Sequence, residues 1–173
     1  MALGNPIDTL QGVDPSFDTP EAIKFIPYVD SNGVADGTGG FAVRLYNGGS
    51  ALTNKATYMV DFDGDEETNP KITACVATTV DVTVVVAASA VAASSWGWFF
   101  FKGYCDVLVE GTTDVAKDDY LKLLTGTTAT ALLKDGTSRT TDSIAIACAA
   151  QASNSEVSTK VYLFGDKVDI DAS

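Results

Sequence analysis

Apolar and polar residues alternate along short segments of this chain, and turn-forming residues separate one segment from the next. Alternation with a period of two is clearest in FAVRLYN (41–47) and TKVYLFG (159–165), and it is typical of half-buried β-strands. The other segments are also short and rich in β-branched and aromatic residues. We therefore predict strands within residues 22–30, 41–47, 56–62, 72–78, 80–87, 96–104, 105–111, 119–126, 129–136, 143–150 and 156–165.

Stretches rich in glycine and asparagine mark the breaks between these strands. SNGVADGTGG (31–40) and NGGS (47–50) are the clearest, because both residue types tolerate the positive φ of tight turns. Turn signals about every eight to twelve residues favour a sandwich or a barrel. We expect an all-β fold, either a sandwich or jelly roll or a small β-barrel, formed by one domain over residues 21–173. Runs of alanine and valine such as SIAIACAAQA (143–152) fit a helix as well as a buried strand.

The first twenty residues show no such periodicity. They contain Pro6, Pro15 and Pro20, and this pattern indicates an extended N-terminal arm in front of the β domain. Pro20 follows Thr19, so residues 19–21 could form one short helical turn with proline at its first position. The opening residues carry neither a basic start nor an apolar core, and we therefore expect no secretory leader.

One uncharged stretch is long enough to be weighed as a membrane span. Residues 82–101 (VTVVVAASAVAASSWGWFFF) lie between Asp81 and Lys102. Their order argues against a transmembrane helix, because a β-branched block is followed by Ala and Ser and then by aromatic residues. We predict two strands joined by a connection of small residues, and no membrane partner.

The composition excludes several classes of function. Eleven basic and 23 acidic residues give a net charge of −12, which repels a phosphate backbone and argues against a nucleic-acid partner. The chain has no histidine, so Ser-His-Asp and Cys-His catalytic sites and histidine-ligated zinc are impossible. GTGG (37–40) lacks the spacing of a dinucleotide fingerprint and the lysine of a P-loop, and it predicts a flexible turn.

Cys75, Cys105 and Cys148 lie far apart in apolar runs, with no C-x-x-C pair. An odd number of cysteines cannot complete a disulfide framework. We predict buried free thiols in a protein that is made in a reducing cytoplasm.

Two groups of carboxylates are candidates for chemistry. Asp61, Asp63 and Asp65 resemble the opening of a calcium loop, but Gly64 stands fourth instead of sixth and the twelfth residue is Ile72. We favour a solvated acidic turn over a calcium site there. In the second group, Asp114, Asp118 and Asp119 could supply a glycosidase pair, although Asp118 or Asp119 more plausibly accepts backbone N–H groups at a turn.

Aromatic residues occupy both faces of the strand predicted at 96–104. Trp96, Trp98 and Phe100 fall on one face, and Phe99 and Phe101 fall on the other. One face can fill the core, whereas the other needs cover from another layer, a subunit or a ligand. Core or subunit contact is favoured over a carbohydrate platform at Trp96 and Trp98.

Four segments of the second half are informative together: KGYCDVLVEGTTDV (102–115), AKDDYLKL (116–123), SRTTDSIAIA (138–147) and KVYLFG (160–165), which span about residues 96–170. In these segments the chain resembles the capsid decoration, or cement, proteins of tailed bacteriophages. AKDDYLKL is similar to the "v-x-x-G-D-x-L" turn of those β-barrels, with Lys117-Asp118 where the pattern prefers Gly-Asp.

This resemblance implies a structural virion protein and not an enzyme, with no catalytic residues, no metal and no cofactor. It implies subunits, often trimers, that bind the major capsid protein across capsomer junctions on the outer capsid surface. An arm in front of a β domain suits such a role, because it can become ordered on a neighbour. The alternative is a carbohydrate-binding β-sandwich module that uses Trp96 and Trp98, with calcium at Asp61, Asp63 and Asp65.

Overall fold

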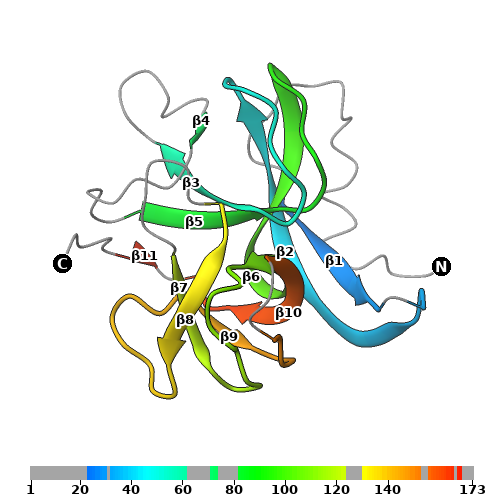
Figure 1. Ribbon diagram of the computed structural model, residues 1–173. Helices are drawn as coiled ribbons and strands as arrows, with labels where there is room; N and C mark the ends of the chain where they lie inside the picture. Colours follow the sequence, from blue (N-terminus) through cyan, green and yellow to red (C-terminus); the bar gives the residue numbers. More distant parts are fainter. Residues whose placement is uncertain are drawn as a thin grey trace.

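The computed structural model describes residues 23–30, 32–61, 71–73, 82–123, 130–152, 156–165 and 167–168 of the chain (Figure 1). These residues form an all-β fold, as the alternating sequence pattern predicts, and none of them lies in a helix. The strands are β1 (Ile23–Val29), β2 (Ala35–Asn47), β3 (Thr57–Asp61), β4 (Lys71–Thr73), β5 (Val82–Ala87), β6 (Ser95–Val109), β7 (Tyr120–Leu123), β8 (Leu132–Gly136), β9 (Ala145–Ala147), β10 (Val157–Leu163) and β11 (Lys167–Val168).

Five of these strands close into a small β-barrel in the lower half of Figure 1. Antiparallel pairing runs from β6 to β10, β9, β7 and β8. The barrel closes where Val109 of β6 pairs in parallel with Leu132 of β8. Closure leaves the barrel strands with few free edges, which limits pairing with other chains.

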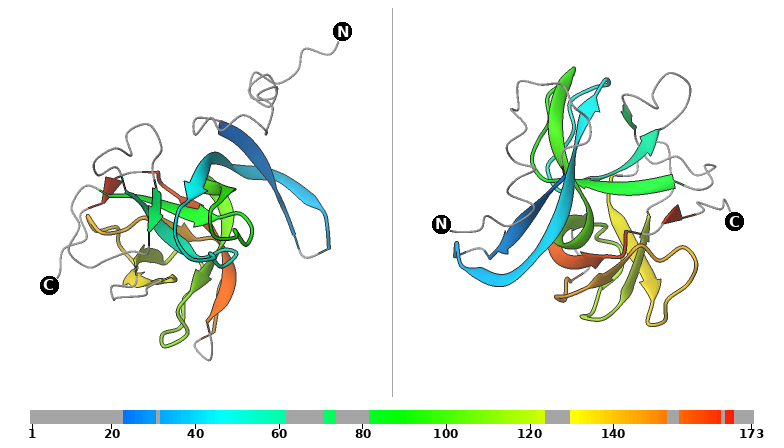
Figure 2. Two further views of the ribbon diagram at one scale, coloured as in Figure 1. Left: turned by 90° about the horizontal axis from the view of Figure 1, so that it is seen from above. Right: turned by 180° about the vertical axis from the view of Figure 1, so that it is seen from behind.

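The upper half contains a second closed ring of strand pairings. This ring runs from β2 through β4, β3 and β5 to β6, and β6 pairs back with β2. The long strand β6 therefore belongs to both rings. Among the described residues, β1 pairs with β2 alone, and this hairpin lies at the edge of the molecule (Figure 2).

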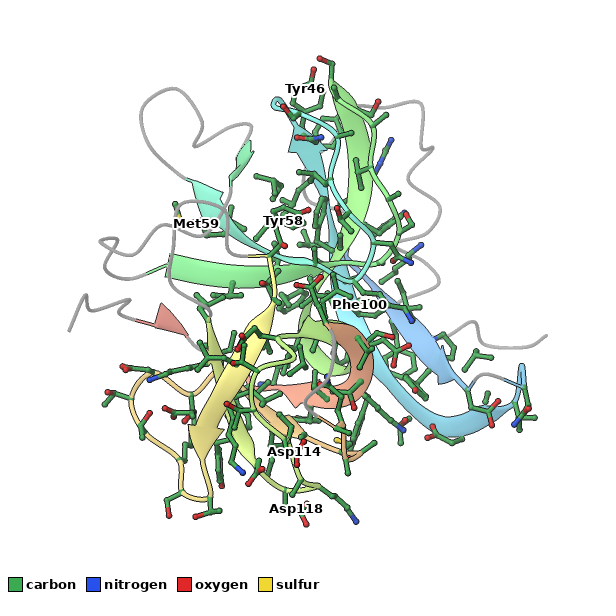
Figure 3. All side chains as sticks on the ribbon, in the orientation of Figure 1. Tyr46, Tyr58, Met59, Phe100, Asp114 and Asp118 are labelled. Carbon is green, nitrogen blue, oxygen red and sulfur yellow. The ribbon has the colours of Figure 1, made fainter. Side chains whose placement is uncertain are left out.

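Each ring has its own hydrophobic core. The barrel core includes Leu121 and Leu132, and the core of the second ring includes Leu45 and Phe99. The two cores share a wall, because side chains of β5 alternate between them: Val84 and Val86 face the barrel core, and Val85 and Ala87 face the other. Strand β3 does the same, with Met59 on one side and Tyr58 on the other (Figure 3).

Glycines allow β6 to pass from one ring to the other. The β2–β6 register shifts between Phe41, opposite Lys102, and Ala42, opposite Phe100, so that Phe101 is left without a partner in the ladder. Gly103 follows with φ 93°, a conformation that residues with a Cβ rarely adopt. Beyond this bulge the inward positions of β6 point into the barrel core.

The bulge also explains two differences from the sequence prediction. The segments 96–104 and 105–111, predicted as two strands, form the single strand β6 as far as Val109, because a bulge at Phe101 and no turn interrupts them. The prediction of a flexible turn at GTGG (37–40) was wrong. These residues lie in β2, and Gly39 and Gly40 are buried where β1, β2 and β6 come close.

The remaining strand predictions in the described residues agree with the structure. Residues 143–150, which also fitted a helix, contain strand β9. The uncharged stretch 82–101 forms β5, a connection of small residues and the start of β6, as predicted. In the part of the chain that the structure describes, no helix has the length and hydrophobicity needed to span a membrane. The predicted arm over residues 1–20 lies outside the described residues.

Candidate interaction surfaces

The β1–β2 hairpin carries most of the exposed large hydrophobic side chains among the described residues. Four of the five large hydrophobic side chains that are exposed lie on it: Ile23 (38%), Val29 (49%), Val34 (59%) and Phe41 (37%). The fifth is Val157 (38%) at the start of β10. Apolar side chains concentrated on one projecting element are typical of a surface that another protein covers.

The turn at the end of this hairpin is held in one conformation by Asp30. Its Oδ1 accepts hydrogen bonds from the backbone N–H groups of Asn32 at 2.8 Å and Val34 at 2.9 Å. These two bonds lower the pKa of the Asp30 carboxyl. Gly33 supplies the positive φ of the turn, 79°. The exposed Val34 side chain therefore projects from an ordered turn.

Lys160 of β10 fastens the hairpin to the outer wall of the barrel. Its ammonium group pairs with the carboxylate of Asp36 and donates to Oγ1 of Thr38 at 3.0 Å. The same nitrogen lies 4.0 Å from the ring centroid of Tyr28 and 5.0 Å from that of Tyr104. The Lys160 hydrogen bond lowers the pKa of Asp36 to about 2.

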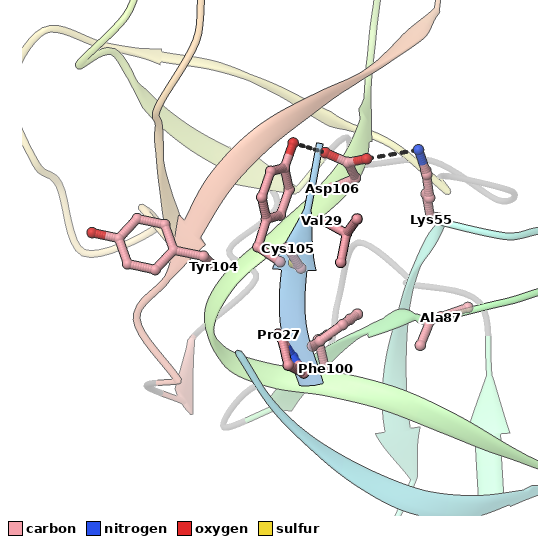
Figure 4. A pocket seen from close by; sticks show the side chains of 10 residues that line it. Pro27, Val29, Lys55, Ala87, Phe100, Tyr104, Cys105 and Asp106 are labelled. Atoms are coloured by element: carbon pink, nitrogen blue, oxygen red, sulfur yellow. Dashed lines mark hydrogen bonds and ion pairs between the residues drawn. The ribbon is translucent and has the colours of Figure 1, made fainter. Parts of the chain in front are cut away.

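A second polar contact lies beside a pocket of about 210 Å³ between β1 and β6 (Figure 4). The Tyr28 hydroxyl donates to Oδ1 of Asp106 at 3.0 Å, and Lys55 donates to its Oδ2 at 2.7 Å. Desolvation and the negative charge of Asp106 raise the pKa of Tyr28 to about 12. Pro27, Val29, Ala87 and Phe100 contribute the apolar wall of the pocket. Tyr28 thus takes part in both groups of contacts that hold the hairpin: its ring lies against the Lys160 ammonium group, and its hydroxyl bonds to Asp106.

A wider groove of about 520 Å³ lies on the outer face of the barrel. Tyr104 and Tyr162 form its aromatic wall with ring centroids 4.9 Å apart, and Ile146 adds apolar surface. Lys117 and Asp118 contribute exposed charges of opposite sign. This groove offers two aromatic rings, packed edge to face, together with a donor and an acceptor.

Cys148 also lines this groove, and it is half-buried. Burial raises its thiol pKa, while the charge of Lys160 opposes this effect. Cys105 is fully buried, and its thiol pKa is raised by desolvation. The prediction of buried free thiols is confirmed for Cys105. Cys148 is also a free thiol, but the prediction that it is buried was wrong, and Cys75 lies outside the described residues.

The aromatic side chains of β6 point to alternate faces, as predicted. Phe99 is fully buried in the second core and Phe101 packs against it. Phe100 packs against the barrel core, and Trp96 and Trp98 are half-buried on the outer side of the second ring. The prediction that one aromatic face fills a core is therefore correct.

Cations cover part of the two tryptophan rings. Lys24 Nζ lies 3.9 Å from the ring centroid of Trp98, and the guanidinium carbon of Arg44 lies 5.3 Å from that of Trp96. The ring of Tyr46 packs 5.5 Å from that of Trp96. We call these five residues of β1, β2 and β6 the cationic–aromatic face. Because Lys24 and Arg44 lie over the rings, Trp96 and Trp98 are a less open carbohydrate platform than their sequence suggests.

In the second group of carboxylates, Asp119 is held by hydrogen bonds that stabilise a turn. Asp119 is only 3% exposed, and its Oδ2 accepts hydrogen bonds from the backbone N–H of Ala116 at 2.7 Å and from Lys134 at 2.6 Å. The Lys134 hydrogen bond lowers the pKa of Asp119, whereas a general acid needs a raised pKa. Asp114 and Asp118 are exposed on loops at the lower end of the barrel (Figure 3).

The prediction that Asp118 or Asp119 serves the turn is confirmed for Asp119. The left-handed residue of this turn is Asp118, with φ 73°. Asp118 therefore supplies the left-handed residue of this turn, and the next residue, Asp119, accepts its backbone N–H hydrogen bond from Ala116.

Of the candidate calcium ligands Asp61, Asp63 and Asp65, the structure describes only Asp61. Asp61 ends strand β3, while Asp63 and Asp65 lie outside the described residues. Among the described side chains, no three or more carboxylates and thiols are grouped so that they could hold a metal ion.

Sequence reasoning missed the residues that fasten the hairpin. Lys160 lies 124 positions from Asp36, and Tyr28 lies 78 positions from Asp106. Each is an ordinary polar or aromatic position on the outer face of a strand, and only strand alternation marks it as outward-facing. In comparisons with known proteins, neither a protein-family model nor a curated protein matches this chain.

Proposed function

We propose that this chain is a structural virion protein, not an enzyme, which decorates a bacteriophage capsid and stabilises it across capsomer junctions. The observation that carries the proposal is the β1–β2 hairpin, which holds four of the five exposed large hydrophobic side chains among the described residues. Exposed apolar side chains concentrated on one hairpin are typical of a surface that adheres to another protein. Its partner is the major capsid protein on the outer surface of the shell.

The shape and chemistry of the described residues support this role. Two closed rings of strands with separate cores give a stiff body, and the hairpin is fastened to that body by Lys160 and Asp106. The buried carboxylate Asp119 has a lowered pKa and a lysine partner, which suits stability and not proton transfer. We propose a homo-oligomer, with a trimer favoured, that binds many times on one shell and gains avidity.

Capsid binding by hairpin variants tests the proposal. The purified protein is mixed with expanded shells that lack it, and co-sedimentation gives the affinity. Val34→Asp places a charge on the most exposed apolar side chain of the hairpin and should weaken binding about tenfold or more, because an apolar contact is replaced by a desolvated charge.

Val157→Asp is the matched control, since Val157 is also exposed but lies on β10, outside the hairpin. It should bind as the unchanged protein does. Equal losses in the two variants would refute the role of the hairpin. A strictly monomeric protein that binds no shell would refute the function itself.

A carbohydrate-binding module is the second candidate, and the barrel groove favours it. The rings of Tyr104 and Tyr162 can stack on the C–H face of a sugar, while Lys117 donates to hydroxyl groups and Asp118 accepts from them. Calorimetry and a glycan array, each with and without calcium, test it. Tyr162→Ala should abolish binding and Trp98→Ala should preserve it; silence in both assays rules the candidate out.

A further inference from the structure

Lys160 lies on one wall of the barrel groove, and its charge is already used by the hairpin. It lines the groove together with Tyr104, Tyr162 and Thr38. Its ammonium group donates to Thr38 and pairs with the carboxylate of Asp36. Asp36 belongs to the exposed part of β2. A cation in the groove is therefore neutralised by an exposed side chain of the hairpin.

A second carboxylate close to Lys160 is occupied by other partners. Asp106 lies opposite Lys160 in the β6–β10 ladder, but its Oδ1 accepts from Tyr28 and its Oδ2 accepts from Lys55. In the part of the chain that the structure describes, the salt bridge of Lys160 is the one with Asp36. Among these side chains, Asp36 is therefore the one that balances the charge of Lys160.

Without Asp36 the lining of the groove is positive. Its charged side chains are Lys117, Lys160 and Asp118, and two positive charges against one negative charge give +1. An anionic group in the groove is attracted by this charge once Asp36 has left Lys160. Asp36 thus occupies the position that the acidic group of a ligand would take.

The contact between Asp36 and Lys160 can be exchanged for another carboxylate. Ion pairs of partly exposed side chains contribute little net free energy, because water and salt screen them. Asp36 is exposed and Lys160 is half-buried. A ligand carboxylate on the Lys160 ammonium group would restore the bond that Asp36 gives up. The exchange therefore loses little electrostatic energy and sets the hairpin free at this point.

The other walls of the groove indicate what carries the acidic group. The rings of Tyr104 and Tyr162 lie edge to face and offer surface for the C–H face of a sugar. Lys117 and Asp118 supply a donor and an acceptor for hydroxyl groups. The volume of about 520 Å³ suits a small polar ligand. A sugar ring that bears a carboxylate, as in a uronic acid, matches all of these groups.

We propose that the barrel groove binds an acidic sugar whose carboxylate replaces Asp36 on Lys160. Asp36 then inhibits binding, and the bound sugar loosens the hairpin. Because coupling between two sites is reciprocal, displacement of the hairpin also strengthens binding in the groove. The proposal rests on the groove function described above as the second candidate, and it does not depend on capsid binding.

NMR titration of the full chain with glucuronate and with glucose, its neutral counterpart, tests the proposal. Asp36→Asn should tighten glucuronate binding about fivefold, because it removes the competing carboxylate from a surface ion pair. It should leave glucose binding unchanged. Asp142→Asn makes the same charge change on the loop before β9, outside the groove lining, and should change neither affinity. Equal glucuronate affinities in Asp36→Asn and the unchanged protein would overturn the proposal.

Lys160→Met shows whether the gain passes through Lys160. In this background Asp36→Asn should no longer tighten glucuronate binding, since the cation for which the two carboxylates compete is gone. A gain that persists would be a general effect of charge and would overturn the proposal.

Amide exchange in β1 and β2 of the unchanged protein measures the effect on the hairpin. Saturation with glucuronate should accelerate exchange, and saturation with glucose should not, because only glucuronate displaces Asp36. If glucuronate binds and exchange in the hairpin stays the same, Asp36 remains on Lys160 and the proposal is wrong.

Cys148 reports the charge of the groove without any sugar. Its backbone N–H donates to the C=O of Lys160, and both residues line the groove. Iodoacetate and iodoacetamide alkylate the same thiolate but differ in charge, so the ratio of their rates does not depend on the thiol pKa. Mass spectrometry of the Cys148 peptide gives both rates. Asp36→Asn should raise the ratio several-fold at low salt, and an unchanged ratio would show that Asp36 does not neutralise the groove.

The outcomes keep this proposal apart from the function on which it rests. Binding of neither sugar to any variant rules out the second candidate function and this proposal with it. Binding of both sugars without any effect of Asp36→Asn overturns this proposal alone. N-acetylglutamate offers a carboxylate without a sugar ring and should bind Asp36→Asn more weakly than glucuronate does. Tighter binding of N-acetylglutamate would assign the groove to an acidic peptide instead.

Discussion

At the scale of single residues, glycines determine how closely the strands can approach one another. A Cβ on Gly97 would lie 2.4 Å from Cγ2 of Val91, and one on Gly40 would lie 2.8 Å from the carbonyl oxygen of Tyr104. Both distances are far shorter than any van der Waals contact. Gly103 combines a close approach with a left-handed backbone. Gly40 and Gly103 allow β2 to cross β6 where the two rings meet, and Gly97 leaves room for the side chain of Val91.

We predict that Gly103→Ala destabilises the protein by about 2–4 kcal/mol, because it combines a left-handed residue with a backbone clash. Its Cβ would lie 2.7 Å from the carbonyl oxygen of Gly39. Gly33→Ala is the control, since Gly33 has a similar φ of 79° and no atom within 4 Å of its Cβ position. It should cost only about 1 kcal/mol. Equal costs in urea unfolding would show that the close approach to Gly39 is unimportant.

At the scale of elements, β1 is an outer strand: it pairs with β2, and β2 is itself a member of the second ring through its ladder with β6. Strand β1 pairs only with β2 in the described part of the chain. Further contacts of the hairpin join Tyr28 to Asp106, Asp36 and Thr38 to Lys160, and Lys24 to the ring of Trp98. Elements held in this way open locally before the core does. The hairpin can therefore adapt to a partner while the body stays intact.

We predict that Lys160→Met loosens the hairpin without unfolding the barrel. The pKa of Asp36 should return from about 2 toward the ordinary value of 3.8. Because the folded pKa is the lower one, the ion pair stabilises hairpin docking above the ordinary pKa, and this contribution is lost as the pH falls through about 2. In the variant this acid-dependent loss should disappear. Carboxyl NMR titration of Asp36 and amide exchange in β1 and β2 measure the two effects.

Lys122→Met provides the comparison, since Lys122 pairs with Asp135 at 3.4 Å, away from the hairpin. Amide exchange in β1 and β2 should be unaffected by it. If Lys160→Met leaves exchange equally unaffected, Lys160 does not fasten the hairpin.

At the scale of the whole molecule, two hydrophobic cores share their walls. Strand β6 runs through both rings, and β3 and β5 place side chains in both cores. Loss of either core would expose one face of these strands to water. Two cores with a common wall are therefore expected to unfold together, as one domain does.

We predict that Leu45→Ala in the second core and Leu121→Ala in the barrel core each lower the stability of both rings by about 2–5 kcal/mol. Leu45 is 4% exposed and Leu121 is 0% exposed. Tryptophan fluorescence reports on the second ring, and alkylation of Cys105, 2% exposed in the barrel core, reports on the other. The two probes should show one common transition in each variant. If Leu45→Ala shifts only the fluorescence transition, the rings are separate units.

Local sequence pattern by itself determined much of the architecture. Alternation with a period of two identified the strands and assigned Phe99 and Trp98 to opposite faces, because side-chain direction in a strand depends only on position. The small-residue connection between β5 and β6 and the turn role of Asp119 also followed from local chemistry, since a turn satisfies its polar groups within a few residues.

Tertiary structure alone decided which strands are neighbours. Alternation states which side chains point inward but not which core they enter, so neither the second ring nor the shared wall of β5 could be derived from it. GTGG (37–40) suggested a turn because glycine is common in turns, whereas here it allows backbones to pack closely. The contacts of Lys160 and Tyr28 join residues more than seventy positions apart. Such pairs form only when the whole chain has folded, because no local interaction brings them together.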